Sequence, residues 1–303
     1  MKIIIVGLLL SVIATFGAPL ERKEISADAK WLLHLDVDAF RQTAVGKYIF
    51  SDVLDKKLND AKKAFPLIGV LVGNVQSLTA FGNEATRHDR NGVLLIKTDV
   101  ESEKKLETLL QAGMAGVTQG FSVEKLDIKD VDVYKVNKDL FVQALHNGHL
   151  LVGKSQTELN KAREVLATGN GSLSESKAFT GFGNTDHGFF LLGIAEGLGE
   201  SAKAFPQAKI LQMAEGGQLT IGEREDKLNF RLALKSKDQE SCNQMQQVIQ
   251  GLIALVSLTQ SDNKELNTFI QTLKIDKGEN LLKINLSFPV SNAIKEIADK
   301  QKG

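Results

Sequence analysis

A tetrapeptide repeat constrains the fold of this chain more than any other feature of its sequence. Lys-Ala-Phe-Pro occurs at residues 63–66 and recurs at 203–206. Each copy precedes a strand-like segment, at 77–84 and at 218–223, in which Leu-Thr is followed by Gly and then by Glu. Matches in the same register are the signature of a repeated structural unit. The sequence therefore predicts an internal duplication.

Hydrophobic spacing predicts a similar order of elements in both copies, since alternating apolar residues indicate strands and apolar residues three and four apart indicate helices. In the first copy the predicted elements are a strand at 31–37, a helix at 38–54, a hairpin of 78–81 with 92–97, a helix at 106–114, a hairpin of 133–136 with 140–145, a strand at 149–153, and a helix that begins at the capping box of Ser155 and Glu158. In the second copy they are a strand at 189–194, a hairpin of 219–222 with 228–234, a helix at 245–256, a hairpin of 269–275 with 281–288, and a last helix around 294–297.

This order predicts an α+β protein. Strands joined by hairpins pair antiparallel, and interleaved helices cover a face of the sheet. We expect two similar halves at residues 25–167 and 187–303, each a mostly antiparallel sheet with helices packed on one face, and a Gly- and Ser-rich linker at 168–186. One continuous sheet and two separate sheets both fit this pattern.

The first residues predict export. Lys2 precedes an apolar stretch at 3–14, and small residues follow up to Ala18. A positive start, about 7–15 apolar residues and a small-residue exit are typical of a secretory signal peptide, whereas a membrane-spanning helix needs about 20 apolar residues. Thr15 and Gly17 suit the positions three and one before a cut, which gives a signal peptide at 1–17 and a periplasmic or secreted protein. The alternatives are a buried first strand and an uncleaved anchor.

Composition argues against several classes of partner. Lys plus Arg number 37, as do Asp plus Glu, so no global field attracts nucleic acid or anionic lipid. Cys242 is the only cysteine, which excludes an internal disulfide. It lies in an apolar helical segment, where we expect it to be buried. The apolar stretch 252–258 is too short to cross a membrane, and we expect it to be a core helix.

The best polar cluster is His34, Asp36 and Asp38, which alternate along the first predicted strand and so share one face. A histidine and two carboxylates on one face suit metal binding or acid–base chemistry. The alternative is a solvated strand face on which Asp38 caps the next helix. The second copy has no equivalent cluster, which weakens the case for an enzyme.

His146 and His149 flank an Asn-Gly pair, the strongest short hairpin signal. As a cross-strand pair they would offer two ligands to a transition metal. The alternative is an ordinary tight turn with two polar residues. We find no serine-nucleophile elbow, phosphate loop, Cys-x-x-Cys or His-Glu-x-x-His pattern, and we predict no cofactor.

Residues 27–40, which end in Asp-x-Asp-Ala-Phe, and residues 150–155 resemble a loosely defined group of exported proteins of unknown function from planctomycete and verrucomicrobial bacteria. The resemblance implies a periplasmic or secreted α+β protein and carries no catalytic residue to this chain.

Together these features favour a non-enzymatic binding or structural protein of the cell envelope, with an unknown protein or small ligand as its partner and with no membrane span after signal cleavage. One alternative is a periplasmic metal-dependent or hydrolytic enzyme that uses His34, Asp36 and Asp38. The other is a protein that binds a lipid or another apolar ligand in a cleft between sheet and helices.

Overall fold

The computed structural model describes residues 17–54, 73–84, 92–114, 122–128, 131–182, 188–199, 209–259, 267 and 270–300. Both copies of the repeated tetrapeptide lie outside these residues, as do positions 1–16 of the predicted signal peptide. The duplication inferred from that repeat therefore stays a prediction.

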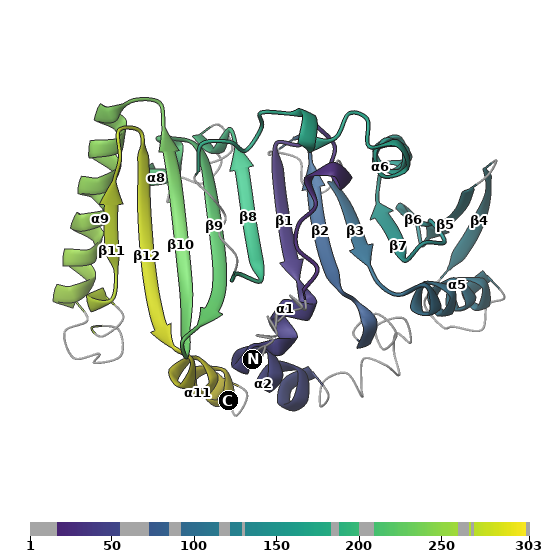
Figure 1. The fold of residues 1–303 in the computed structure, drawn as a ribbon, viewed down its shortest axis with the longest axis horizontal. Coiled ribbons are helices and arrows are strands. Elements are labelled where there is room, and N and C mark those ends of the chain that lie inside the picture. Colours follow the sequence, from purple (N-terminus) through teal and green to yellow (C-terminus); the bar gives the residue numbers. More distant parts are fainter. Residues whose placement is uncertain are drawn as a thin grey trace, which may run out of the picture.

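The described strands form one twelve-stranded antiparallel sheet in the order β11-β12-β10-β9-β8-β1-β2-β3-β7-β6-β5-β4 (Figure 1). Their bounds are β1 Trp31–Asp36, β2 Ser77–Gly82, β3 Gly92–Lys97, β4 Val123–Ile128, β5 Val131–Val136, β6 Leu140–Ala144, β7 His149–Gly153, β8 Leu191–Glu196, β9 Ala214–Arg224, β10 Lys227–Ser236, β11 Lys274–Lys277 and β12 Leu281–Pro289. With its helices this sheet makes the protein α+β, as predicted.

The sheet is continuous because β1 and β8 pair with each other, with Trp31 opposite Ala195. This pairing joins the strands of the two predicted halves edge to edge. The hairpins predicted from alternation are present: β2 pairs with β3, β5 with β6, β9 with β10, and β11 with β12. Strand β4, which the sequence analysis did not predict, is the edge strand next to β5.

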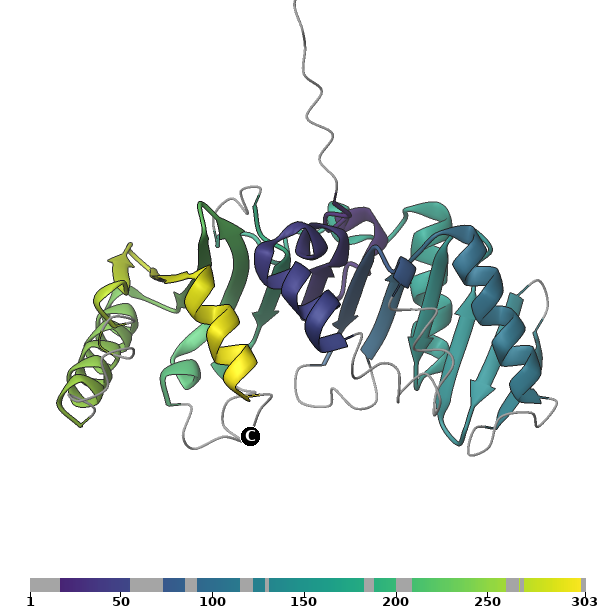
Figure 2. The same cartoon turned by 90° about the horizontal axis from the view of Figure 1, so that it is seen from below.

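Helices cover both faces of the sheet, so the expectation of one covered face does not hold (Figure 2). Leu95 and Leu151 pack in one core with α6 (Gln156–Thr168), whereas their strand neighbours Ile96 and Leu150 pack in another with α5 (Val100–Met114). Adjacent residues of a strand point to opposite faces. The apolar residues of β3 and β7 are consecutive, which is the pattern of a strand buried on both sides.

The helix predicted at 38–54 is divided into α1 (Val37–Gln42), α2 (Ala44–Tyr48) and the π-helical turn η2 (Ile49–Leu54). The break falls at Thr43, whose Oγ1 accepts a hydrogen bond of 2.8 Å from the backbone N–H of Gly46. A threonine that caps a new helix in this way takes a non-helical backbone conformation, so it ends the helix before it.

The part of the predicted linker that the structure describes is packed against the start of the chain. Ser172 forms a β-bridge with Ser26, and Leu173, in the short 3-10 helix η3 (Leu173–Glu175), is fully buried. Arg22, in the 3-10 helix η1 (Arg22–Glu24), donates hydrogen bonds to three carbonyls of this segment, those of residues 173, 176 and 178. The segment is therefore anchored to the core, in which Leu173, Phe179 and Phe182 are buried.

Helix α9 (Gln239–Thr259) runs along the β11 edge of the sheet, and only one side of it is buried. Cys242 is fully buried, as predicted. The prediction that 252–258 is core is wrong: the exposed fractions of Leu252, Leu255 and Leu258 are 48, 55 and 78%. The helix is about 32 Å long at 1.5 Å per residue, whereas the four-residue edge strand β11 spans only about 13 Å. The helix is therefore longer than the strand beside which it runs, and part of its apolar surface lacks a neighbouring strand.

Two shorter elements complete the fold, α8 (Lys209–Gln212) and the last helix α11 (Val290–Lys300). Helix α11 packs with α2 below the strands of Figure 1. Within the described residues, no helix combines the length and hydrophobicity needed to cross a membrane.

Candidate binding cleft

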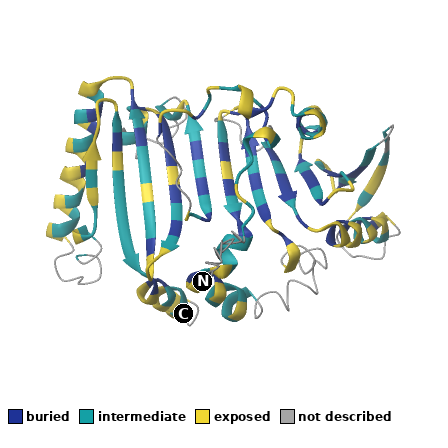
Figure 3. Ribbon diagram, in the orientation of Figure 1, coloured by how far each residue is buried: buried dark blue, intermediate teal, exposed yellow. Residues whose placement is uncertain are grey.

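Strand β1 buries its polar side and exposes part of its apolar side. His34 and Asp36 are only 2 and 6% exposed, whereas Leu33, which precedes His34, is 47% exposed on the opposite face (Figure 3). The alternative of a solvated polar face is therefore wrong for His34 and Asp36. The polar side is buried because residues 17–27 of the chain cross it, with Ile25 almost fully buried in the core that also holds Leu32.

This side of β1 forms part of a cleft of about 1300 Å³. Its floor is the face of the sheet that carries Leu32, His34, Asp36, Leu192, Ile194 and Gln218, from β1, β8 and β9. Its walls come from residues 17–22, from α1 and from two loop segments, and their apolar part includes Leu20, Phe179, Phe189 and Phe190. The cleft thus combines aromatic and aliphatic walls with a few polar groups at the floor.

His34 is a neutral hydrogen-bonding group at this floor. Its Nδ1 lies 2.8 Å from the hydroxyl of Thr79 on β2, and its buried Nε2 makes no hydrogen bond of normal geometry. Burial lowers the pKa of His34 below its ordinary value, and the nearby Asp36 carboxylate and Ala18 carbonyl offset this only in part. The imidazole is therefore neutral, and its Nε2 is covered from solvent near the Ala18 carbonyl.

Asp36 rather than Asp38 caps α1, which corrects the prediction. The Oδ1 atom of Asp36 accepts a hydrogen bond of 2.8 Å from the backbone N–H of Ala39. Asp38 lies in the first turn of the helix, where its Oδ1 accepts a hydrogen bond of 3.0 Å from Arg41. Burial raises the pKa of Asp38, which Arg41 partly opposes. The strand ends at Asp36, so the alternation that predicted a face shared by all three residues stops before Asp38.

Two charged residues that line the cleft, Glu223 and Arg22, form hydrogen bonds with the backbone of its walls. The carboxylate of Glu223, at the end of β9, accepts hydrogen bonds of 2.7 and 3.1 Å from the backbone N–H groups of Ala44 and Val45. It thereby caps α2 from a strand far away in sequence. Arg22 is likewise engaged with the carbonyls of residues 173–178.

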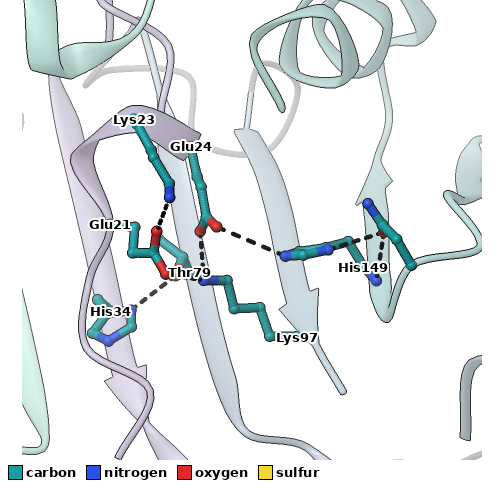
Figure 4. A network of polar contacts seen from close by, with 8 residues as sticks. Glu21, Lys23, Glu24, His34, Thr79, Lys97 and His149 are labelled. Atoms are coloured by element: carbon teal, nitrogen blue, oxygen red, sulfur yellow. Dashed lines mark hydrogen bonds and ion pairs between the residues drawn. The ribbon is translucent and has the colours of Figure 1, made fainter. Parts of the chain in front are cut away.

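A network of charged side chains lies beside the cleft and fixes the start of the chain to the sheet (Figure 4). Lys97 of β3 lies 2.8 Å from Glu24 and 3.3 Å from Glu21, and the side chains of Lys97 and Glu24 are only 14 and 13% exposed. His149 of β7 approaches Glu24 to 3.8 Å with Nε2. Burial alone raises the pKa of Glu24, but the contacts with His149 and Lys97 outweigh it, and the pKa lies below its ordinary value.

The two histidines predicted to share a metal site lie in different surroundings. Whereas His149 faces Glu24, His146 lies 3.1 Å from Asp132, and Glu107 of α5 supplies a third group. One ligand atom from each of Glu107, Asp132 and His146 lies within 4.8 Å of the others. His146 itself has a positive φ of 59°, so it belongs to the turn and not to a strand.

This second cluster has the donor set of a zinc site, but its carboxylates are already used. Lys125 forms an ion pair with Asp132, and the hydroxyl of Tyr134 donates a hydrogen bond of 2.8 Å to Glu107. Burial and this hydrogen bond raise the pKa of Tyr134 to about 12, so the phenol keeps its proton. A divalent cation would have to compete with Lys125 for Asp132. We therefore interpret the cluster as a network of ion pairs and hydrogen bonds that connects α5 to the sheet.

Sequence reasoning did not identify Thr79, Lys97, Gln218 or the segment 17–24, which line the cleft or lie beside it. No motif marks them, because strand pairing and contacts between distant parts of the chain bring them together. The pattern of β3 contained one signal, since Lys97 ends a run of apolar residues at a position where a buried lysine needs a partner.

Comparisons with known proteins bear on the fold alone. No protein-family profile matches the chain. No curated protein sequence matches it either. Solved structures with a similar fold include two crystal forms of TP0453: crystal form III has a TM-score of 0.50 and 10% identity and covers 93% of this chain and 99% of that one. Crystal form I has a TM-score of 0.50 and 12% identity, with coverage of 93 and 98%.

Proposed function

We propose that this protein is an exported, non-enzymatic binding protein whose central cleft takes an elongated amphipathic molecule of the size of a lipid. The observation that carries the proposal is the cleft itself, which joins a volume of about 1300 Å³ to apolar walls and to the polar side chains of His34 and Asp36 at its floor. Sites for small molecules are usually mostly apolar, with a few fixed polar groups that orient the ligand.

The distribution of polar and apolar groups supports an amphipathic ligand over a fully polar one. Phe179, Phe189, Phe190, Leu192 and Ile194 offer contact to hydrocarbon. Two polar side chains of the floor, His34 and Asp36, lie next to the 17–20 segment. A ligand with an apolar body and a small polar end that lies near His34 and Asp36 matches this arrangement.

Export is the second part of the proposal. It rests on the positively charged start, the apolar stretch and the small residues before Ala18, and on the resemblance of residues 27–40 to exported bacterial proteins of unknown function. An exported location would give the protein access to lipids of the envelope. The internal duplication is also kept as a proposal, in which the two copies meet where β1 pairs with β8.

The alternative of an enzyme that uses His34, Asp36 and Asp38 has less support. Asp38 lies on α1 and is paired with Arg41, so the proposed triad retains two members. Neutral His34 and the helix-capping Asp36 are each accounted for by binding and by local structure. We therefore favour a binding function.

Extraction of the purified protein with organic solvent, followed by mass spectrometry, tests this proposal. We expect a stoichiometric lipid-like molecule, and saturable one-to-one binding of a fluorescent fatty acid by the extracted and refolded protein. Ile194→Trp should fill the cleft and abolish this binding, whereas Leu33→Trp on the opposite face should leave it unchanged. Thermal unfolding of both variants identifies any loss of fold. An empty protein that shows no saturable binding would refute the proposal.

A further inference from the structure

The segment that follows the predicted signal-peptide cut lines the cleft. Pro19 and Leu20 contribute to its wall, as does Gly17, the last residue of the predicted signal peptide. A Cβ atom placed on Gly17 would stand 2.8 Å from Oδ2 of Asp36. The backbone carbonyl of Ala18 is close enough to the His34 ring to raise its pKa. The first residue of a chain cut after Gly17 would therefore lie between the two polar groups of the cleft floor.

Contacts further along the chain fix this position. Arg22 binds three carbonyls of the 173–178 segment, Lys97 pairs with Glu21 and Glu24, and Ile25 is almost fully buried. Residue 18 is held only three residues before Glu21. The path of residues 18–20 is thus set by side chains that belong to the mature chain.

Asp36 lacks a cationic partner in the part of the chain that the structure describes. Its Oδ1 accepts from Ala39, whereas Oδ2 faces Gly17. The charged and titratable side chains near it are His34, which is neutral, and Asp38, which is paired with Arg41 and adds a negative charge. A buried carboxylate beside a second carboxylate is costly without a counter-ion.

We propose that hydrolysis of the Gly17–Ala18 bond during export supplies this counter-ion, and that the new α-ammonium of Ala18 forms an ion pair with Asp36 at the floor of the cleft. Water adds across the peptide bond, so the carboxylate leaves with residues 1–17 and the ammonium stays on Ala18. In the precursor the same nitrogen is an uncharged amide. Processing therefore completes the polar end of the cleft, and the inference rests on the export part of the proposed function.

Two measurements test the inference, and neither depends on whether a lipid binds. The first is the intact mass of the full-length chain after expression and export in a bacterial host, which should correspond to a chain that begins at Ala18. A mature chain with any other first residue overturns the proposal.

The second is the pH dependence with which acetic anhydride labels the α-amine, read from the N-terminal peptide by mass spectrometry. The samples are released from a fusion so that Ala18 is the first residue. We expect the α-amine to titrate about one pH unit above the usual range of about 7.7–8.0. The shift should disappear in Asp36→Asn, which keeps a side chain able to cap α1.

A free peptide of residues 18–24 is the control, because it carries the same α-amine without Asp36, and its titration should fall in the usual range. An amine that titrates identically with Asp36 and with Asn at that position overturns the ion pair. Circular dichroism of each sample confirms that the comparison is made between folded proteins.

Discussion

Replacement of Lys97 by methionine is expected to destabilise the protein strongly, because it leaves a buried carboxylate without its main partner. Lys97 lies 2.8 Å from Glu24, and both side chains are largely buried, with 14 and 13% of their surface exposed. Methionine preserves the apolar stem of lysine and removes only the ammonium. The cost therefore reports the lost charge and not a cavity.

The magnitude follows from the surroundings of Glu24. Loss of one partner of a buried ion pair typically costs 3–5 kcal/mol. Glu24 keeps a small exposed fraction and the approach of His149 at 3.8 Å, which places the expected loss at the lower end, about 3 kcal/mol. The double variant Lys97→Met with Glu24→Gln removes both charges, and it should lose no more than about 1 kcal/mol, since uncharged groups need no counter-ion.

Urea unfolding, followed by far-ultraviolet circular dichroism and by the fluorescence of the single tryptophan, Trp31, measures these differences. Coincident transitions in both signals would justify one free energy of unfolding. Lys105→Met is the control, because Lys105 pairs with Glu101 at 2.7 Å on the exposed surface of α5 and should leave the midpoint unchanged. A loss below 1 kcal/mol for Lys97→Met, or a double variant as unstable as the single one, would refute the reasoning.

Three further outcomes are expected. The pKa of His34 is lowered in the folded protein, so as the pH falls the unfolded chain takes up a proton before the folded protein does. Stability should therefore fall as the pH drops below the ordinary value of 6.5, and His34→Gln should flatten this part of the profile. The pKa of Glu24 is also lowered, so its contribution is complete above the ordinary value of 4.5 and is lost as the pH falls through its folded pKa; Glu24→Gln should flatten that second window. On α9, Met245→Ala should cost about 2–5 kcal/mol because Met245 is fully buried, whereas Leu255→Ala on the exposed side should change the midpoint little.

Urea midpoints measured from pH 8 to pH 3 check the first two expectations, and an unchanged slope in either variant within its own window would contradict the assigned cause. For α9, equal losses in the two variants would mean that the helix is buried on both sides in solution.

Much of the fold was predictable because its strands are local hairpins with turn signals between them. The turn between β9 and β10 shows that such signals locate a turn but do not give its length. The sequence indicated a loop of four polar residues, 223–226, whereas the chain turns within Glu225 and Asp226, both with positive φ. Polar residues at the end of a strand look like a loop in sequence, even when they continue the ladder as Glu223 and Arg224 do.

Sequence reasoning was less successful where burial is decided by distant segments. The alternation of His34, Leu35 and Asp36 predicts a strand with one polar and one apolar face, but periodicity does not say which of the two faces is covered. Here residues 17–27 and 171–182 cover the polar face, and they do so through contacts more than a hundred positions apart, such as those of Arg22 with residues 173–178. No local pattern encodes that pairing.

The position of β1 explains why the cleft, the ion network and the start of the chain occur together. A strand in the middle of a sheet has both of its edges paired, so only its faces can meet other groups, and here a short N-terminal segment covers one of them instead of a helix. A segment of this kind buries less surface than a helix, and it leaves room beside it for the cleft. It also carries few apolar side chains to hold it in place, so its attachment depends on Arg22 and on the pairs between Lys97 and its two glutamates. The ion network is therefore expected to stabilise the cleft wall as well as the fold.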